Sequence, residues 1–185
     1  MVLLSVLIPT LEERADTFLA LELSLLEQIE DSGLVGVVEV IGHCDNREHT
    51  TGHKRNCLMQ WAKGEYVAFV DDDDEVHQSY CRFIVSALET RPDVVGICGV
   101  YNVDGAYNGI FEHSMRHKEW STVGDNRYLR CPNHLNPVRR DLALMAGFPD
   151  VTVGEDHEYS TKLLPLLKTE VMIEKPIYTY MARSH

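Results

Sequence analysis

The first hundred residues alternate short apolar runs with segments of helical periodicity, and this alternation restricts the possible folds more than any other feature. Short β-favouring apolar runs predict buried strands, and the amphipathic segments between them predict helices. Strands are expected at 2–8, 35–41, 66–70 and 94–100, and helices at 10–31, 51–63 and 80–90. This order predicts an α/β fold with an open, mostly parallel sheet flanked by helices. A chain of 185 residues is expected to form one domain.

Local signals mark the ends of several predicted elements. Thr10 and Glu13 have the spacing of a capping box, which predicts that the first helix begins there. Gly64 is expected to end the second helix in the left-handed conformation. Residues 43–46 are expected to form a loop, because Asp and Asn follow a predicted strand there.

The second half of the chain is less regular. The stretch 101–128 has no clear period, so it is interpreted as a long functional loop or a short antiparallel excursion. Short helices are expected near 138–145 and from Glu155 onward. Two short strands, 171–173 and 177–180, are expected on either side of Pro176.

The charge balance limits the class of ligand and partner. Seventeen Lys and Arg against 29 Asp and Glu give a net charge of -12, which repels polyanions and argues against nucleic-acid binding. The apolar run 2–8 is too short to span a bilayer and lacks the basic residues of a signal peptide. Five cysteines without a C-x-x-C pair argue against a disulfide scaffold. We therefore expect a cytoplasmic protein without a transmembrane segment.

Two acidic segments directly follow predicted strands. Asp71 to Asp74 come after the third strand, and Asp45 comes after the second. Ligands of open α/β sheets bind beyond the carboxyl ends of the strands, so both segments are expected at one site. Adjacent carboxylates favour a divalent cation, while the structural alternative is a solvated acidic turn. An EF-hand is excluded because Val76 and Arg82 stand where that loop needs Gly and Glu.

A second possible metal site is a group of histidines and cysteines. It consists of His43, Cys44, His49, His53 and Cys57. Their spacing matches no usual structural zinc pattern, and isolated His and Cys residues near a helix are more often surface or core residues. Zinc therefore remains only an alternative here.

Several motifs occur in the order found in family 2 glycosyltransferases. They are Val6-Leu7-Ile8-Pro9-Thr10, Gly52-His53-Lys54-Arg55-Asn56, Gly64 to Asp74, Gly147-Phe148 and Gly154-Glu155-Asp156. The chain resembles a small, single-domain member of that family over most of residues 2–183, and least so over 101–130. This resemblance implies the GT-A fold, with a Rossmann-like central sheet. It also implies a nucleotide-sugar-binding half, about 1–100, and an acceptor and catalytic half, about 101–185.

The resemblance also implies roles for the acidic cluster. Asp71-x-Asp73 resembles the D-x-D motif, with Asp73 as the direct ligand of Mn2+ or Mg2+. Asp71 and Asp72 are expected on the nucleotide-sugar side, and Asp74 is able to substitute in either role. The tail resembles one in which His185 closes over the metal and the diphosphate.

Further donor-binding residues follow from the same resemblance. Pro9, Thr10 and Glu12 lie where the first loop meets the nucleotide, and Asp45 resembles the residue that binds the base. The segment around Asp45 departs from the usual Asp-Asp-Gly-Ser. Arg55 is expected to face the nucleotide pocket, and its structural alternative is a surface charge on a helix.

Asp156 resembles the catalytic base of the family, in the motif Glu155-Asp156. The structural alternative is plain capping, because acidic residues are favoured in the first turn of a helix. In the acceptor half, Tyr107, Trp120 and Tyr128 are expected to contact the acceptor, unless they form a satellite hydrophobic cluster.

The expected function is metal-dependent, inverting transfer of a sugar from a nucleotide diphosphate sugar, a UDP-sugar, to a hydroxyl group of a glycan, a lipid or another acceptor. A sugar-phosphate nucleotidylyltransferase is the first alternative. It would need a glycine-rich loop after the first strand, and 9–14 contain no glycine. A nucleotide-sugar or cation binding module without turnover is the second alternative.

Overall fold

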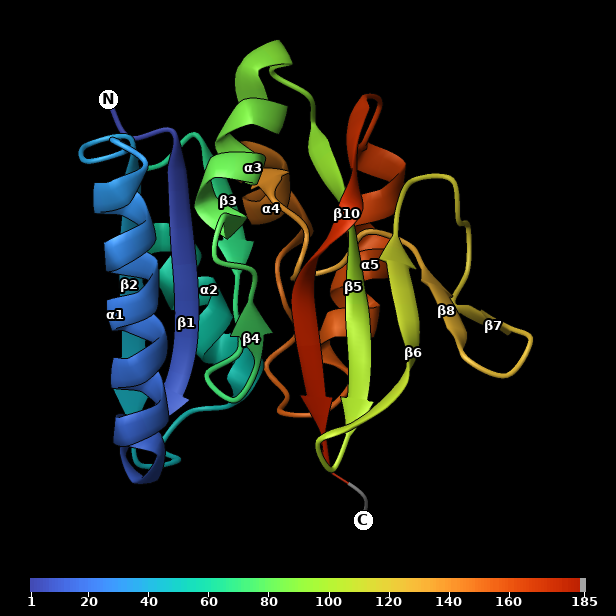
Figure 1. The fold of residues 1–185 in the computed structure, drawn as a ribbon, viewed down its shortest axis with the longest axis horizontal. Coiled ribbons are helices and arrows are strands. Elements are labelled where there is room, and N and C mark those ends of the chain that lie inside the picture. Colours follow the sequence, from blue (N-terminus) through green and yellow to red (C-terminus); the bar gives the residue numbers. More distant parts are fainter. Residues whose placement is uncertain (184–185) are drawn as a thin grey trace.

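The computed structural model describes residues 1–183, which form one ten-stranded mixed sheet with helices on both faces (Figure 1). The strands are β1 (Leu4–Leu11), β2 (Val38–Asp45), β3 (Tyr66–Phe69), β4 (Glu75–Val76), β5 (Val94–Val103), β6 (Ala106–His113), β7 (Ser121–Val123), β8 (Arg127–Arg130), β9 (Val138–Arg139) and β10 (Glu170–Ala182). The helices are α1 (Ala15–Asp31), α2 (Thr51–Trp61), α3 (Tyr80–Ala87), α4 (Arg140–Ala146) and α5 (Glu155–Leu163). Short 3-10 turns occupy Glu12–Arg14, Leu88–Thr90 and Leu164–Leu166.

The central strands are parallel, as the alternation in the sequence predicts. β1 pairs in parallel with β2 on one side and β3 on the other, and β10 pairs in parallel with β5. The short strand β9 lies antiparallel to both β3 and β5 and connects the two parts of the sheet. The carboxyl ends of β1, β2 and β3 therefore lie side by side at the lower edge of the sheet in Figure 1.

Alternating side chains of the central strands build a core on each face of the sheet. In β1, Val6 and Ile8 pack with α1 and α3, whereas Leu7 packs with α2, α4 and α5. β3 alternates in the same way, with Ala68 on the first face and Phe69 on the second. The two buried faces explain why these strands are apolar throughout.

The stretch 101–128 is the antiparallel excursion rather than a long loop. β5 continues to Val103 and forms a hairpin with β6, and β8 then joins β6 and pairs with β7. The two predicted C-terminal strands are one strand, β10, with register shifts on either side of Pro176. Proline lacks the N–H that a continuous ladder requires, which accounts for the irregularity at this point.

The capping box predicted at Thr10 and Glu13 is wrong. β1 continues through Leu11, and the Thr10 hydroxyl donates a 2.6 Å hydrogen bond to Asp72 instead of capping α1. The loop predicted at 43–46 is also wrong in part, because β2 pairs with β1 as far as Asp45. Tertiary partners in the neighbouring strands thus replace the local hydrogen bonds that the sequence suggested.

The predicted left-handed cap at Gly64 is wrong as well, since the positive backbone angles among the described glycines lie elsewhere. A Cβ atom at Gly64 would lie 2.6 Å from the Ser5 backbone nitrogen. Gly64 therefore permits close approach to β1 rather than an unusual backbone angle. Within residues 1–183, no helix combines the length and the apolar character needed to cross a membrane.

Candidate functional site

A cavity of about 470 Å³ opens at the carboxyl ends of β1 and β3. Among its lining residues are six that the sequence predicts for nucleotide-sugar or metal binding: Pro9, Thr10, Arg55, Asp71, Asp72 and Asp73. Glu12 is exposed and does not line this cavity, and Asp45 does not line it either but is hydrogen-bonded to Lys54, which does. His185 lies outside the described residues. The structure therefore brings most of the predicted donor-side residues to one place.

Asp72 and Asp73 differ in how far other protein groups occupy their carboxylates. Asp72 is buried, accepting hydrogen bonds from the Thr10 hydroxyl at 2.6 Å and from Arg14 Nη1 at 2.7 Å. Asp73 is 34% exposed and receives one side-chain contact, from Arg14 Nη1 at 3.0 Å. Of these two aspartates, Asp73 is thus the one whose carboxylate oxygens are available to a metal ion in the cavity.

Asp74 is held by the last strand of the sheet. Its carboxylate accepts 2.7 Å hydrogen bonds from the Tyr178 hydroxyl and the Met181 backbone N–H, both on β10. The same Tyr178 oxygen accepts a hydrogen bond from the Asp71 backbone N–H. Burial, together with the charge of Asp71, raises the pKa of Asp74. Asp74 therefore anchors the acidic loop to β10, although the sequence allowed it a role in ligand binding.

Arg55 is a buried residue, not a surface charge on a helix. Its side chain is 3% exposed and lies over the rings of Phe69 and Phe148, at 5.1 and 5.8 Å. Its Nη2 donates to Asp71 at 2.8 Å, and its Nε lies 3.5 Å from Glu155. Burial would lower the pKa of Arg55, but these carboxylates outweigh that effect and raise it. The guanidinium therefore links the acidic loop to the start of α5.

Lys54 is a buried site residue that sequence reasoning missed. Its Nζ donates to Asp45 at 2.8 Å and to the Thr10 carbonyl at 2.7 Å. Burial would raise the pKa of Asp45, yet the hydrogen bonds from Lys54 and the His49 backbone hold it at about 2. Lys54 lies four residues before the fully buried Leu58, so helical periodicity already placed it on the inner face of α2.

The negative charge of the acidic loop is not fully compensated within the protein. Burial and the charges of Asp72 and Asp71 raise the pKa of Asp73, despite the nearby Arg14. Carboxylate oxygens are ligands that Mg2+ and Mn2+ prefer, and Mg2+ often takes one or two carboxylates together with substrate phosphates. Within residues 1–183, no three His, Cys, Asp or Glu side chains form a complete metal site. The donor set therefore fits a cation whose remaining ligands come from the substrate.

The histidine and cysteine group does not form a zinc site in the part of the chain that the structure describes. His49 and His53 stack at 4.5 Å, and His43 lies 4.7 Å from Trp61. The contacts that the structure shows for these histidines are ring packing.

Asp156 lines a second cavity, of about 210 Å³, formed with the β5 to β8 strands. It lies in the first turn of α5, where its Oδ1 accepts a 2.8 Å hydrogen bond from the His157 N–H. Five aromatic side chains dominate the walls of this second cavity: Tyr101, Phe111, Trp120, Tyr128 and Tyr180. Tyr107 is 66% exposed and does not line it. Asp156 thus lies at the helix start that the sequence suggested, and the structure also places it in the wall of a cavity.

Histidines and an arginine complete this second cavity, and sequence reasoning missed them. His134 lies 3.4 Å from Asp71, so it connects the two cavities, while burial holds the pKa of His113 at about 3. Arg130, at the end of β8, packs over Trp120 and Tyr128. His113 and Arg130 lie on strands and His134 in the turn between β8 and β9, all outside any sequence motif, so the only signal was the cluster of polar residues among the aromatics.

Comparisons with known proteins agree with this architecture. The sequence profile of Glycosyl transferase family 2 matches residues 39–141, more than half of the chain. No curated protein sequence matches the chain. The crystal structure of S. aureus TarS 1-349 in complex with UDP is similar with a TM-score of 0.67 and 19% identity, over 97% of this chain and 60% of that chain.

Two further TarS structures match in the same way. The complex of TarS 1-349 with UDP-GlcNAc has a TM-score of 0.67 and 18% identity, over 99% of this chain and 59% of that chain. The structure of S. aureus TarS has a TM-score of 0.63 and 17% identity, over 97% of this chain and 37% of that one. This chain therefore spans 60% or less of the length of these proteins. The profile match and the shared architecture show that the chain belongs to glycosyl transferase family 2 and has the GT-A fold.

Proposed function

We propose that this protein transfers a sugar from a nucleotide diphosphate sugar to an acceptor hydroxyl, with Mn2+ or Mg2+ and with inversion of the anomeric centre. The observation that carries the proposal is the position of Asp73. It is the most exposed aspartate of the acidic loop and has one side-chain partner, Arg14, at the wall of the larger cavity. Asp156 lines the neighbouring cavity, so a metal ligand and a base lie on two adjoining sides of one site.

The donor is proposed to occupy the larger cavity, with Pro9 and Thr10 at its wall. A UDP-sugar is supported by the family and by the TarS complexes with UDP and UDP-GlcNAc, whose fold this chain shares. Asp45 keeps its proposed place beside the base, although its oxygens already accept hydrogen bonds from Lys54 and the His49 N–H. Glu12 would contact the nucleotide from the exposed rim.

The metal would be held by Asp73, with Asp71 nearby in its water shell or beside the ribose. Once bound, a divalent cation neutralises negative charge that develops on the leaving diphosphate. Arg14 now contacts Asp73 at 3.0 Å, so it is the protein cation that shares this charge. Asp72 and Asp74 hold the loop in place through their own hydrogen bonds.

Asp156 is proposed to take the proton of the acceptor hydroxyl. A hydroxyl group is a weak nucleophile near neutral pH, and a positioned carboxylate raises the rate about 100- to 10,000-fold. The neighbouring Glu155 is buried against Arg55 and faces the other cavity, which leaves Asp156 as the carboxylate of this pair on the acceptor side. Attack from that side, opposite to the leaving diphosphate, would invert the anomeric centre.

The test measures donor binding and turnover with purified protein. Calorimetry with UDP and Mn2+ is expected to show affinity that falls at least about tenfold with EDTA or in Asp73→Asn, because a charged ligand is lost. Glu75→Gln is the matched control, since it removes an exposed carboxylate two residues away. Metal-independent UDP binding of equal strength in Asp73→Asn would contradict the metal assignment.

A panel of UDP-sugars incubated with Mn2+ then separates catalysis from simple binding. Release of free UDP, with or without an added acceptor, is expected from a transferase. Binding without any release would instead support the non-catalytic module. Release of a sugar phosphate on addition of pyrophosphate would support the nucleotidylyltransferase.

A further inference from the structure

Arg130 stands out because its charge is directed into the aromatic cavity without a carboxylate partner. Its Nη1 donates to two backbone carbonyls, of Ser121 at 2.5 Å and Leu129 at 3.0 Å. Its guanidinium carbon lies 5.2 Å from the ring of Trp120 and 5.6 Å from that of Tyr128. These contacts hold Nη1 and pack the guanidinium against two rings, while its other nitrogens donate no side-chain or backbone hydrogen bond among the described residues.

The other arginines near the site are paired with carboxylates. Arg14 lies 2.7 Å from Asp72, and Arg55 lies 2.8 Å from Asp71. Within residues 1–183, no Asp or Glu lies within ion-pair distance of Arg130. Arg82 and Arg140 also contact a ring or backbone carbonyls rather than a carboxylate, but neither lines the aromatic cavity, where Arg130 is the one Lys or Arg among the described lining residues.

The lowered pKa of Arg130 reflects the energetic cost of this arrangement. Burial lowers the pKa of Arg130, whereas for Arg14 and Arg55 the carboxylate partners outweigh burial and raise it. A buried or half-buried charge is costly unless a counter-charge accompanies it. Tyr128, Tyr101 and Asp156 act to raise this pKa, but burial outweighs them, so the protein's own residues offset the cost of the charge only in part.

Among the described residues that line this cavity, Asp156 is the one carboxylate, and it acts on Arg130 only through space. His113 is buried and neutral, and His134 contacts Asp71 at 3.4 Å. Asp156 faces the same cavity, but its Oδ1 accepts a hydrogen bond from its own helix. The aromatic walls offer flat apolar surface for a sugar or polyol, and Arg130 offers one positive charge.

We propose that the molecule bound in this cavity carries an anionic group, a carboxylate or a phosphate, which forms an ion pair with Arg130 while its ring or chain packs on the aromatic walls. Arg130 is then a specificity-determining residue for an anionic acceptor. This inference rests on the proposed function, since it assigns the cavity beside Asp156 to the acceptor. Arginine suits this role because its planar guanidinium binds carboxylates and phosphates with two parallel hydrogen bonds.

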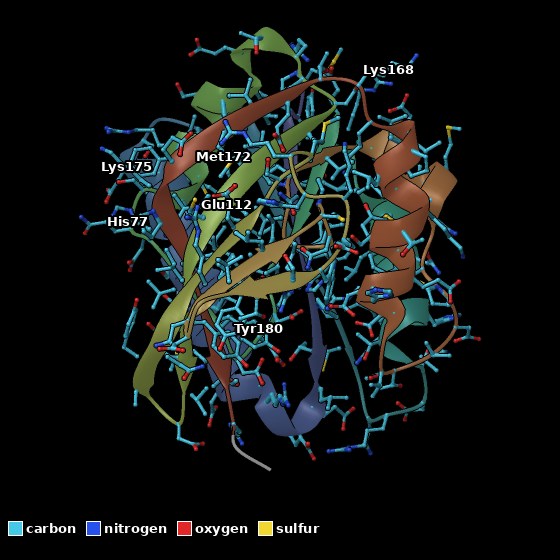
Figure 2. The ribbon with its side chains drawn as sticks, turned by 90° about the vertical axis from the view of Figure 1, so that its right-hand side faces the viewer. His77, Glu112, Lys168, Met172, Lys175 and Tyr180 are labelled. Carbon is cyan, nitrogen blue, oxygen red and sulfur yellow. The ribbon has the colours of Figure 1, made fainter. Side chains whose placement is uncertain are left out.

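The experiment compares neutral and anionic probes on the protein loaded with UDP and Mn2+. The probes are methyl glucoside, methyl glucuronide and glucose 6-phosphate, and their dissociation constants are measured by calorimetry or ligand-observed NMR. The variants are Arg130→Gln, which removes the charge, and Arg130→Lys, which retains it. Arg127→Gln is the matched control, because Arg127 lies on the same strand and pairs at the surface with Glu112, labelled in Figure 2.

For the wild-type protein, we expect at least one anionic probe to bind about tenfold or more tightly than the glucoside, as a charge-assisted pair would give. The preference should disappear in Arg130→Gln, persist in part in Arg130→Lys and remain in Arg127→Gln. The probe that is preferred identifies the group as a carboxylate or a phosphate. UDP binding serves as the measure of folding for each variant.

Several results would overturn the inference. These are equal or undetectable binding of all three probes to the wild-type protein, a preference that survives in Arg130→Gln, and a preference lost equally in Arg127→Gln. In each case UDP binding and UDP release would still stand, so the proposed transferase function would be unaffected. Loss of UDP binding in the wild-type protein would instead contradict the proposed function itself.

Discussion

The acidic edge, formed by Asp71 to Asp74 with Thr10, Arg14 and Arg55, contrasts with the aromatic cavity around Asp156. At the acidic edge, each aspartate already has a protein partner, and Asp73 is the most exposed of them, with one side-chain contact, to Arg14. The aromatic cavity is built by packed rings, with Arg130 unpaired. Protein hydrogen bonds therefore fix the side chains of the acidic edge without a ligand. In the aromatic cavity, by contrast, the charge of Arg130 is expected to be neutralised by the ligand.

Several contacts connect these regions, among them the 3.5 Å ion pair of Arg55 with Glu155, the neighbour of Asp156. His134 lies at the wall of the aromatic cavity and 3.4 Å from Asp71. Gly52, at the start of α2, donates from its backbone N–H to the carbonyl of Val151, in the loop that leads to Asp156. Changes on one side are thus expected to reach the other through these contacts.

The largest expected effect is the loss of turnover in Asp156→Asn. Asparagine keeps the shape of the side chain and its capping ability but removes the basic oxygen, so kcat should fall about 100-fold or more. UDP binding in the presence of Mn2+ should be retained, because the donor occupies the other cavity. The measurement is steady-state transfer to the best acceptor found, beside calorimetry on the same preparation. Near wild-type kcat would show that Asp156 is a structural cap, and that the aromatic cavity holds no base at this position.

Gly52→Ala tests the contact between the start of α2 and the loop that leads to Asp156. An added Cβ would overlap the Pro149 carbonyl oxygen and lie 3.1 Å from that of Val151, so the loop before α5 must shift. We expect a loss of about 3 kcal/mol in the free energy of unfolding, measured with urea. The sign of this change is informative, because alanine in place of glycine otherwise raises the free energy of unfolding by about 0.5–1 kcal/mol at an exposed helix position. Gln60→Ala, at an exposed position of the same helix, is the control. An unchanged or raised urea midpoint in Gly52→Ala would show that the close contact of Gly52 with Pro149 and Val151 does not stabilise the fold.

The pH dependence of unfolding tests whether His113 stays neutral in the wall of the aromatic cavity. Its pKa is about 3 in the folded protein and 6.5 in its unperturbed state, so below pH 6.5 the unfolded chain binds the proton and the folded protein does not. This histidine therefore leaves the free energy of unfolding unchanged above that pH. Below it, the free energy of unfolding falls by about 1.4 kcal/mol per pH unit, or about 2 kcal/mol by about pH 5. Unfolding measured across this range should be less pH-dependent in His113→Gln. The exposed His77 gives the control His77→Gln, and equal slopes for all three proteins would contradict the assignment.

The smallest expected effect concerns the walls of the aromatic cavity. Trp120→Ala should raise the KM for the acceptor about fivefold, because one packed aromatic face is lost. Tyr107→Ala is the control on the neighbouring surface, since Tyr107 lies outside the cavity. If Trp120→Ala lowers stability but leaves KM unchanged, the aromatic residues form only a satellite hydrophobic cluster.

The sequence by itself determined the order of elements and the location of the acidic edge. Strand and helix periods are local properties, and the carboxyl ends of parallel strands always meet at one edge of the sheet. For this reason Asp71 to Asp74 and Thr10 could be placed together before any coordinates were known. The motifs also sufficed to identify the family, because their order along the chain is itself the signal.

Only the tertiary structure decided how these groups are partnered. Thr10 bonds to Asp72 across 62 residues instead of capping α1, and Asp74 bonds to Tyr178 across 104. Lys54 and Arg55 proved to be buried, and Arg130 reached a cavity that no motif marks. A hydrogen bond between distant segments depends on which strands become neighbours, and that information is absent from any local pattern of residues.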